Sequence, residues 1–249
     1  MTEQIKISAV SYLNTKPFLY GLFRSDLNKE CNISLDFPAE SARKLINSEV
    51  DLGLVPVAII PKIANAQIVS DFCIGAVGPV KTVCIYAEKP LEQIHQIYLD
   101  YQSRTSVLLA QILLRDFWNL KPELLSAPTN YIDHISGNKA GVIIGDRTFG
   151  LEQRFPFVYD LSAAWHEMTG LPFVFAAWVS NKTLTHNFLD RFNNALSDGI
   201  TRIEQVAQLF QSSHFNIDVF DYLSKYISYD LDTEKKKGLE LFLKMIDDM

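Results

Sequence analysis

The sequence predicts an α/β protein made of two lobes, with a ligand cleft between the lobes and a helical segment at the C-terminus. Strand and helix patterns alternate through the first 57 residues, and they begin to alternate again near residue 97. β-rich segments near residues 79–84 and 174–179 are suited to carry the chain between the two blocks. The middle block therefore reads as an insertion that divides the first lobe into two parts of the chain.

The first lobe begins with a buried strand that runs into a polar turn. Apolar residues 7–10 form the strand, and Pro17 suits the first turn of the next helix, because its missing N–H would lack a partner there. The elements then alternate as expected for a mostly parallel sheet. They are a helix over residues 17–26, a strand over 33–37, a helix over 41–50 and a strand over 51–57. A long β-rich segment, 68–86, follows, and its glycines and proline indicate a bend or a passage between lobes.

The second lobe repeats the pattern before the chain becomes helical. We expect a strand over residues 97–100, an amphipathic helix over 103–120, and strands over 140–146 and 171–179. Beyond Leu184 we expect helices over residues 188–209, 219–227 and 233–249. The predicted domains are therefore residues 1–82 with 178–249 for lobe I, and 83–177 for the inserted lobe II.

Composition excludes some classes of partner. The chain has 249 residues, of which 48% are hydrophobic and 21% charged, as in a soluble globular protein with a proper core. Its net charge of −6 argues against nucleic acid, which calls for a basic face. A small anionic ligand is still compatible, because a pocket binds through its local donors rather than through the net charge.

The cysteines, the histidines and the first residues indicate where the protein works. Cys31, Cys73 and Cys84 are odd in number and widely spaced, and the histidines are scattered, so we expect reduced thiols and no metal site. The start lacks a basic region followed by a long apolar one, and no apolar run approaches the roughly 20 residues that span a bilayer. We expect a cytoplasmic protein without a membrane partner, as a monomer or homodimer.

Polar residues gather at four strand or loop ends that we expect to face the cleft. Open α/β sheets place ligands at strand ends, where helix N-termini offer N–H groups to an anion. The four clusters are Ser11 with Asn14, the crossing at residues 78–82 with Thr82, the run Ser103, Thr105 and Ser106, and Gly145 with Asp146.

Two of these clusters have a structural interpretation beside the functional one. Residues 103–106 open a helix directly after a strand, so their hydroxyls can cap that helix, hold a carboxylate, or do both. Asp146 can cap the turn that follows it. No established catalytic motif is present, and residues 75–82 lack the glycine that a phosphate-binding loop needs directly before its Lys-Thr pair.

Several motifs resemble one enzyme family along essentially the whole chain. The specific ones are Ser-Tyr-Leu-Asn-Thr-Lys-Pro at residues 11–17 and Thr-Gly-Leu-Pro-Phe-Val-Phe-Ala at 169–176. Further matches lie at residues 51–57, 78–83, 103–107, 144–146 and 159–161, with Trp165. On these residues the chain resembles the chorismate dehydratases of the futalosine route to menaquinone, a menaquinone-biosynthesis family with a type II periplasmic-binding-protein-like fold.

The resemblance implies an activity and a substrate. It implies elimination of water from chorismate, a small dianion, to give 3-[(1-carboxyvinyl)oxy]benzoate. Because the reaction makes a benzene ring without oxidation, no cofactor is expected. The family commonly carries Ser at the position of Thr82, and this chain keeps the hydroxyl but adds a methyl group.

The resemblance also suggests roles for the four clusters. Ser103, Thr105 and Ser106 would bind one carboxylate, assisted by Thr82 and nearby N–H groups, while Ser11 and Gly145 complete the binding set. Asn14 would orient the ring and stabilise the leaving hydroxyl. Asp146 is one candidate base, and a substrate carboxylate or a bound water is the other.

Two alternatives to this activity come from different classes. One is the enzyme of the same pathway that forms 1,4-dihydroxy-6-naphthoate, which typically has a different first motif. The other is a non-enzymatic small-anion-binding protein with the same fold. A secreted receptor would normally begin with a signal peptide, and a regulator would carry a DNA-binding domain before the first strand, so the sequence favours the dehydratase.

Overall fold

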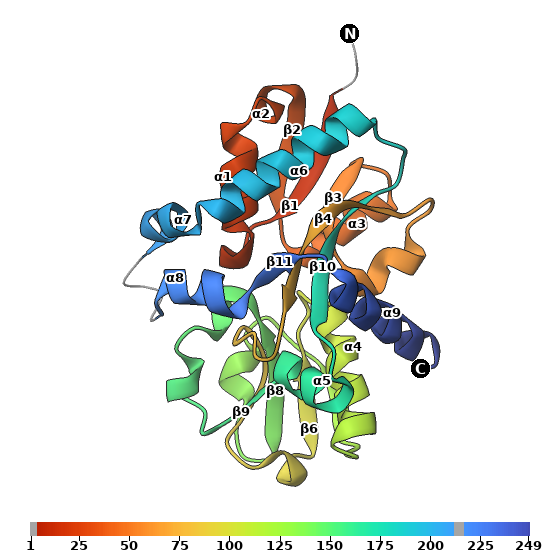
Figure 1. The fold of residues 1–249 in the computed structure, drawn as a ribbon. Coiled ribbons are helices and arrows are strands. Elements are labelled where there is room, and N and C mark those ends of the chain that lie inside the picture. Colours follow the sequence, from red (N-terminus) through yellow and green to blue (C-terminus); the bar gives the residue numbers. More distant parts are fainter. Residues whose placement is uncertain (1–3, 212–216) are drawn as a thin grey trace.

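Two β-sheets, one in each lobe, form the framework of the protein (Figure 1). This computed structural model describes residues 4–211 and 217–249. The sheet of lobe I contains β1 (Ile5–Val10), β2 (Cys31–Asp36), β3 (Leu52–Pro56), β4 (Gln67–Ala76), β10 (Phe173–Ser180) and β11 (Ser228–Asp230). The sheet of lobe II contains β5 (Val83–Ala87), β6 (Gln96–Leu99), β7 (Glu123–Ser126), β8 (Lys139–Ile144) and β9 (Phe157–Asp160). The predicted two-lobed α/β fold is confirmed.

The sheet of lobe I mixes parallel and antiparallel strands. Its order is β11-β4-β10-β3-β1-β2. β1 lies parallel to β2 and β3, whereas β10 runs antiparallel to β3 and β4, and β11 antiparallel to β4. The predicted parallel arrangement is confirmed for β1, β2 and β3, and the antiparallel pairings come from β10 and β11, which join this sheet after the chain has passed through lobe II.

Helices cover the sheet of lobe I. They are α1 (Lys16–Arg24), α2 (Leu27–Glu30), α3 (Pro38–Ile46), α6 (His186–Thr201) and α7 (Ile203–Phe210). Pro17 lies in the first turn of α1, as predicted. α1 and α6 cross closely at two glycines, because a Cβ on Gly21 would lie 1.8 Å from the Ala195 carbonyl oxygen and one on Gly199 would lie 1.8 Å from that of Pro17. The predicted helix over residues 188–209 is thus two helices, α6 and α7.

Lobe II has the strand order β7-β6-β8-β5-β9 and two helices. β6 runs parallel to β7 and β8, while β5 runs antiparallel to β8 and β9. The predicted helix over 103–120 is shorter, with α4 (Thr105–Ile112) passing into a π-helical turn at Leu113–Phe117. A second helix, α5 (Leu161–Thr169), was not predicted. It begins at Asp160, whose carboxylate accepts the N–H groups of Ser162 and Ala163 at 2.9 and 3.0 Å.

The chain crosses between the lobes at residues 77–82 and again at 170–172. The first crossing was predicted near 79–84, and the second near 174–179. The second lies earlier because all of β10 belongs to the sheet of lobe I, where Phe173 pairs with Ala76 of β4. Residues 173–177 therefore belong to the sheet of lobe I. The predicted domain boundaries, with 1–82 and 178–249 in lobe I and 83–177 in lobe II, stay a prediction.

The C-terminal segment returns to the junction of the lobes. α8 (Val219–Asp221) continues as a π-helical turn at Tyr222–Tyr226, and β11 then joins the edge of β4. The last helix, α9 (Thr233–Asp247), matches the predicted helix over residues 233–249. Figure 1 shows α9 beside β10. A Cβ on Gly238 would lie 2.2 Å from the Pro172 carbonyl oxygen, so α9 packs tightly on the second crossing.

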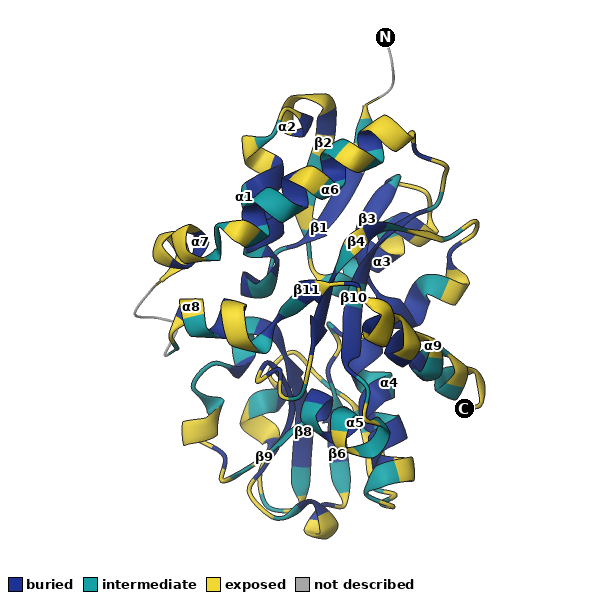
Figure 2. Ribbon diagram, viewed as in Figure 1, coloured by how far each residue is buried: buried dark blue, intermediate teal, exposed yellow. Residues whose placement is uncertain are grey.

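Burial follows the layers of the fold. The central strands such as β3, β5 and β8 are buried, the edge strands β2, β7 and β9 are only partly so, and the covering helices bury one face and expose the other (Figure 2). Cys31, Cys73 and Cys84 are free and buried, in agreement with the prediction of reduced structural thiols. No helix within residues 4–211 and 217–249 is long and apolar enough to cross a membrane.

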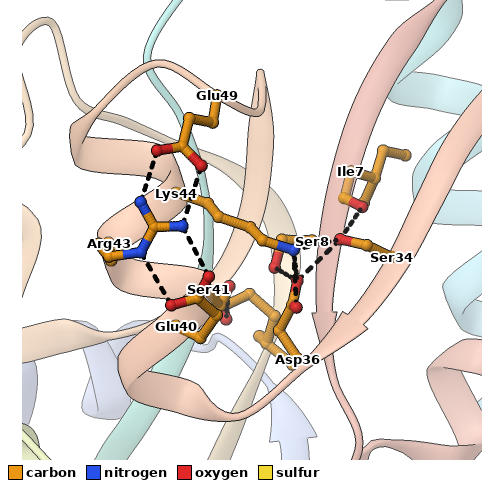
Figure 3. Close-up of polar contacts among 10 residues, drawn as sticks. Ile7, Ser8, Ser34, Asp36, Glu40, Ser41, Arg43, Lys44 and Glu49 are labelled. Atoms are coloured by element: carbon orange, nitrogen blue, oxygen red, sulfur yellow. Dashed lines mark hydrogen bonds and ion pairs between the residues drawn. The ribbon is translucent and has the colours of Figure 1, made fainter.

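A polar cluster joins the carboxyl ends of β1 and β2, close to the predicted site (Figure 3). The Asp36 carboxylate accepts the hydroxyls of Ser8 and Ser34 at 2.8 and 2.7 Å. It also pairs with the Lys44 ammonium at 2.7 Å. Burial alone would raise the pKa of Asp36, but these hydrogen bonds outweigh it and lower the pKa. The Asp36 carbonyl accepts the N–H of Ser11 at 3.1 Å, which fixes the start of the turn after β1.

Candidate active site

Residues from both lobes line a narrow cleft between the two sheets. Six of the predicted site residues lie together in its wall: Asn14, Thr82, Ser103, Thr105, Ser106 and Gly145. Tyr12 and Thr15 also contribute to it. The cavity volume is only about 60 Å³, against the ~300–1,000 Å³ of a typical small-molecule site. The cavity in this structure is therefore smaller than a typical small-molecule site.

Asn14 lies in a 3-10 turn, Leu13–Thr15, directly after β1. Its amide oxygen accepts the hydroxyl of Thr15 at 3.2 Å, and its backbone carbonyl accepts the hydroxyl of Tyr229 at 3.0 Å. Because Oδ1 is the acceptor for Thr15, Nδ2 is the donor group of this amide, and the side chain also contacts the hydroxyl of Tyr222. Asn14 is therefore held by both its side chain and its main chain.

Asp146 connects the lobes and stands outside the cleft lining. Both of its carboxylate oxygens accept the backbone N–H of Leu13, each at 3.1 Å. Burial raises the pKa of Asp146, and the Leu13 N–H and the nearby Lys16 charge only partly oppose this. An N–H group that the turn could have offered to an anionic ligand is thus engaged by the protein's own carboxylate.

Gly145 allows close contact between the lobes. Its φ is +66°, and a Cβ there would lie 2.8 Å from Cε2 of Tyr12. Its N–H donates to the Thr82 carbonyl at 2.8 Å. Tyr12 in turn donates from its hydroxyl to Oε1 of Gln102 at 2.6 Å. Gly145 therefore acts through its backbone and through the space that it leaves for the Tyr12 ring.

Two hydroxyls of the run 103–106 form hydrogen bonds within the protein. The Ser103 hydroxyl accepts the N–H of Ser106 at 3.0 Å, which confirms the capping interpretation. Oγ1 of Thr105 accepts the N–H of Ala58 at 3.2 Å, a contact from lobe II to the segment after β3. Ser103 and Thr105 are thus engaged by the fold, and the ligand role predicted for Ser106, which also lines the cleft, stays a prediction.

Thr82 ends the first crossing, which a carboxylate of lobe II holds in place. Asp160 accepts the N–H groups of Val80 and Lys81 at 2.9 and 2.7 Å. These N–H groups had been expected to assist in binding a ligand, and Asp160 occupies them instead. The Thr82 hydroxyl lies 2.8 Å from the hydroxyl of Tyr222. Thr82 is therefore positioned by residues from lobe II and from the C-terminal segment.

A buried carboxylate supports the floor of the cleft on the lobe II side. Asp100 is 2% exposed and accepts the N–H of Ile144 at 3.1 Å and that of Gln102 at 2.9 Å. It also forms an ion pair with Arg147. These contacts join the carboxyl ends of β6 and β8, from which Gln102 contacts Tyr12 and Gly145 enters the cleft lining.

Ser11 remains beside the cleft. Its backbone is fixed by Asp36, and its side chain lies outside the lining, although it directly precedes Tyr12. In the described part of the chain, no group of three or more His, Cys, Asp or Glu side chains is arranged to hold a metal ion. The arrangement offers neutral hydroxyl and amide donors from two lobes, which suits a small polar or anionic organic ligand.

A sequence model of proteins described as "menaquinone biosynthesis" matches residues 5–248. The chain belongs to the menaquinone biosynthesis family. A chorismate dehydratase from Campylobacter jejuni is 34% identical over 127 residues, which are 48% of this chain and 54% of that protein. The chain thus matches about half the length of that relative. A chorismate dehydratase from Thermus thermophilus is 27% identical over 197 residues, covering 69% of this chain and 70% of its own length.

Solved structures resemble this family member over nearly its whole length. A protein from Archaeoglobus fulgidus has a TM-score of 0.76 at 14% identity, with 99% of this chain and 98% of that one covered. The aliphatic sulphonate binding protein SsuA from Escherichia coli has a TM-score of 0.61 at 15% identity, with 100% and 93% covered. At these identities the likeness shows the fold, which is that of the periplasmic binding proteins.

Sequence reasoning missed several residues that shape the site of this family member. Tyr12, Gln102, Asp160 and Tyr222 each make a contact at or beside the cleft. Tyr12 and Asp160 carried a signal, because they lie inside the matched runs at residues 11–17 and 159–161. Gln102 and Tyr222 lie in segments whose approach to the cleft depends on the tertiary fold.

Proposed function

We propose that this chain is a cytoplasmic chorismate dehydratase of the futalosine route to menaquinone, converting chorismate to 3-[(1-carboxyvinyl)oxy]benzoate. The observation that carries the proposal is the gathering of Asn14, Thr82 and the N-terminus of α4 in one cleft between two lobes. Membership of the menaquinone biosynthesis family and the names of the two relatives support the choice of substrate.

The chemistry of the reaction suits the groups in the cleft. A ring carbon loses its proton, the neighbouring carbon loses its hydroxyl, and the ring becomes aromatic without net oxidation or reduction. The cleft must bind two carboxylates and stabilise a departing hydroxyl. Hydroxyls from Ser106 and Thr82 supply neutral donors for a carboxylate, and the N-terminus of α4 adds a favourable dipole.

Asn14 is the proposed catalytic residue. Its amide Nδ2, oriented by the hydroxyl of Thr15, donates to the leaving oxygen as negative charge develops there. A donor held in place before the reaction needs no reorganisation during it. That is why the two contacts that fix Asn14, from Thr15 and Tyr229, matter to the proposal.

The proton acceptor in this proposal is a carboxylate of the substrate or a bound water. Asp146 is the second candidate, but both of its oxygens receive the N–H of Leu13. That engagement favours a positioning role for Asp146 between the lobes. A general base must come within hydrogen-bonding reach of the proton that it removes.

The test is incubation of the purified protein with chorismate, followed by mass spectrometry for a product lighter by one water. Asn14→Ala should lose most of the activity, while Asn28→Ala, an exposed asparagine of α2, serves as the matched control and should keep it. Tight chorismate binding without product would favour a binding protein. Neither binding nor product would direct the search to the later, naphthoate-forming step.

A further inference from the structure

The hydroxyl of Thr82 has a buried partner in the C-terminal segment. Tyr222 is 3% exposed, and its Oη lies 2.8 Å from Oγ1 of Thr82. Its ring packs edge-to-face on Phe149 of lobe II, with the ring centroids 5.5 Å apart. Tyr222 thus contacts both the crossing and lobe II, and its orientation is fixed by packing as well as by the hydrogen bond.

The direction of this hydrogen bond follows from the partners of each hydroxyl. Thr82 has one proton, and its Oγ1 also lies 3.4 Å from the carbonyl of Val80, a distance at the weak limit of hydrogen bonding. Burial raises the pKa of Tyr222, and its contacts with the side chains of Thr82 and Asn14 oppose this only in part, so the phenol keeps its proton. When Tyr222 donates to Thr82, the proton of Thr82 can turn from the weak Val80 contact to a ligand oxygen at little cost.

We propose that Tyr222 is a positioning residue, which donates to Thr82 so that the Thr82 hydroxyl acts as a hydrogen-bond donor to the substrate in the cleft. A hydroxyl that accepts one hydrogen bond becomes a better donor in the next. Tyr229 of the same segment donates to the Asn14 carbonyl, so residues 222–229 contact both Thr82 and Asn14. The proposal rests on the proposed function, because the ligand that Thr82 contacts is taken to be chorismate.

The test is a double-mutant cycle between Tyr222→Phe and Thr82→Val, measured as kcat/KM for chorismate. We expect Tyr222→Phe to lower kcat/KM about ten-fold, the size of one hydrogen bond. In the Thr82→Val background the same change should cause a much smaller loss, because no Thr82 hydroxyl remains to be oriented and only the contact of Tyr222 with Asn14 is removed. Tyr159→Phe is the matched control, since the hydroxyl of Tyr159 accepts the N–H of Leu91 at 2.9 Å in lobe II, outside the cleft lining. It should leave kcat/KM unchanged.

Equal ten-fold losses in both backgrounds, or no loss in either, would overturn the proposal. If the wild type binds chorismate without dehydrating it, the proposed function fails, and the same cycle measured on Kd still decides the role of Tyr222. A ligand-independent readout is the side-chain orientation of Thr82 in crystals of the wild type and of Tyr222→Phe. An unchanged Thr82 orientation together with unchanged affinity would show that Tyr222 only packs.

Discussion

The backbone N–H of Leu13, in lobe I, donates to both carboxylate oxygens of Asp146, in lobe II, at 3.1 Å. This contact joins the two lobes and places a buried carboxylate beside the turn that carries Asn14. The ionisation of Asp146 therefore bears on the stability of the folded protein, because burial raises its pKa.

Asp146→Asn should change how stability depends on pH. Burial raises the folded-state pKa of Asp146 above the value of ~3.9 in an unfolded chain. A carboxyl of this kind adds stability at low pH that is lost as the pH rises through the raised pKa. The variant has no such group, so its free energy of unfolding should improve relative to the wild type between pH 4 and pH 7. Urea unfolding at each pH measures this, and a shift in the opposite direction would contradict the role of burial.

Asp36→Asn should have the opposite pH dependence. The pKa of Asp36 is lowered, because its hydrogen bonds with Lys44, Ser34 and Ser8 outweigh burial. Its stabilisation is present above the unfolded pKa and is lost as the pH falls through the folded one. We expect a loss of about 1–2 kcal/mol at pH 7 that shrinks below about pH 4. Glu40→Gln, in the exposed Arg43 cluster of Figure 3, is the control and should change little.

Gly145→Ala should destabilise the protein more than Gly150→Ala does. Both glycines have positive φ, +66° and +83°, so both changes cost about 1 kcal/mol through the backbone. Only at Gly145 does the new Cβ meet a neighbour, the Tyr12 ring at 2.8 Å, whereas the space beside Gly150 is open. We expect Gly145→Ala to lose about 2–3 kcal/mol in thermal unfolding. Equal losses would mean that the ring moves aside.

Asn14→Ala should reduce turnover far more than binding. An amide that stabilises charge only in the transition state contributes about 10²–10³-fold to kcat and little to affinity. Steady-state kinetics together with calorimetric titration of chorismate separate the two. Thr15→Val removes the hydroxyl that orients the amide and should give a partial loss. Near-native turnover in Asn14→Ala would rule out the catalytic assignment.

Ser103→Ala and Ser106→Ala should separate the capping role from the ligand role. Ser103 caps the N-terminus of α4, so its loss should cost about 1 kcal/mol of stability and leave the KM for chorismate nearly unchanged. Ser106→Ala should raise KM several-fold with little change in melting temperature. The opposite result would mean that Ser106 stabilises the helix and Ser103 contacts the ligand.

The convergence of the site on one cleft was predictable from the sequence, because polar residues directly after buried strands meet at one edge of an α/β sheet. Asn14, Thr82 and the run 103–106 are positions of this kind, and they do lie together. The use of their N–H groups was not predictable. Asp160 is 80 residues from Val80, and only the tertiary fold brings its carboxylate to the crossing.

The contacts of the C-terminal segment could not be predicted from the sequence either. Residues 219–227 were predicted to be helical, and a helix pattern alone does not reveal that Tyr222 contacts Thr82, which lies 140 residues earlier. β11 has only three residues, too few for a strand pattern to be recognised, and it exists because β4 offers an edge. The strand over 171–179 was recognised, but its assignment to a lobe depended on its partners in the sheet.

The strand order of lobe I determines when each sheet can be completed during synthesis. All strands of the second sheet come from residues 83–160, so that sheet is complete once β9 has been made. β4 lies between β10 and β11, so both of its edges stay unpaired until residues 173–180 and 228–230 have emerged. The inserted lobe can therefore fold first, during synthesis. Until β10 and β11 have been made, both edges of β4 are unpaired, and unpaired edges favour incorrect strand pairing. A chain that stops before residue 228 would keep one edge of β4 exposed.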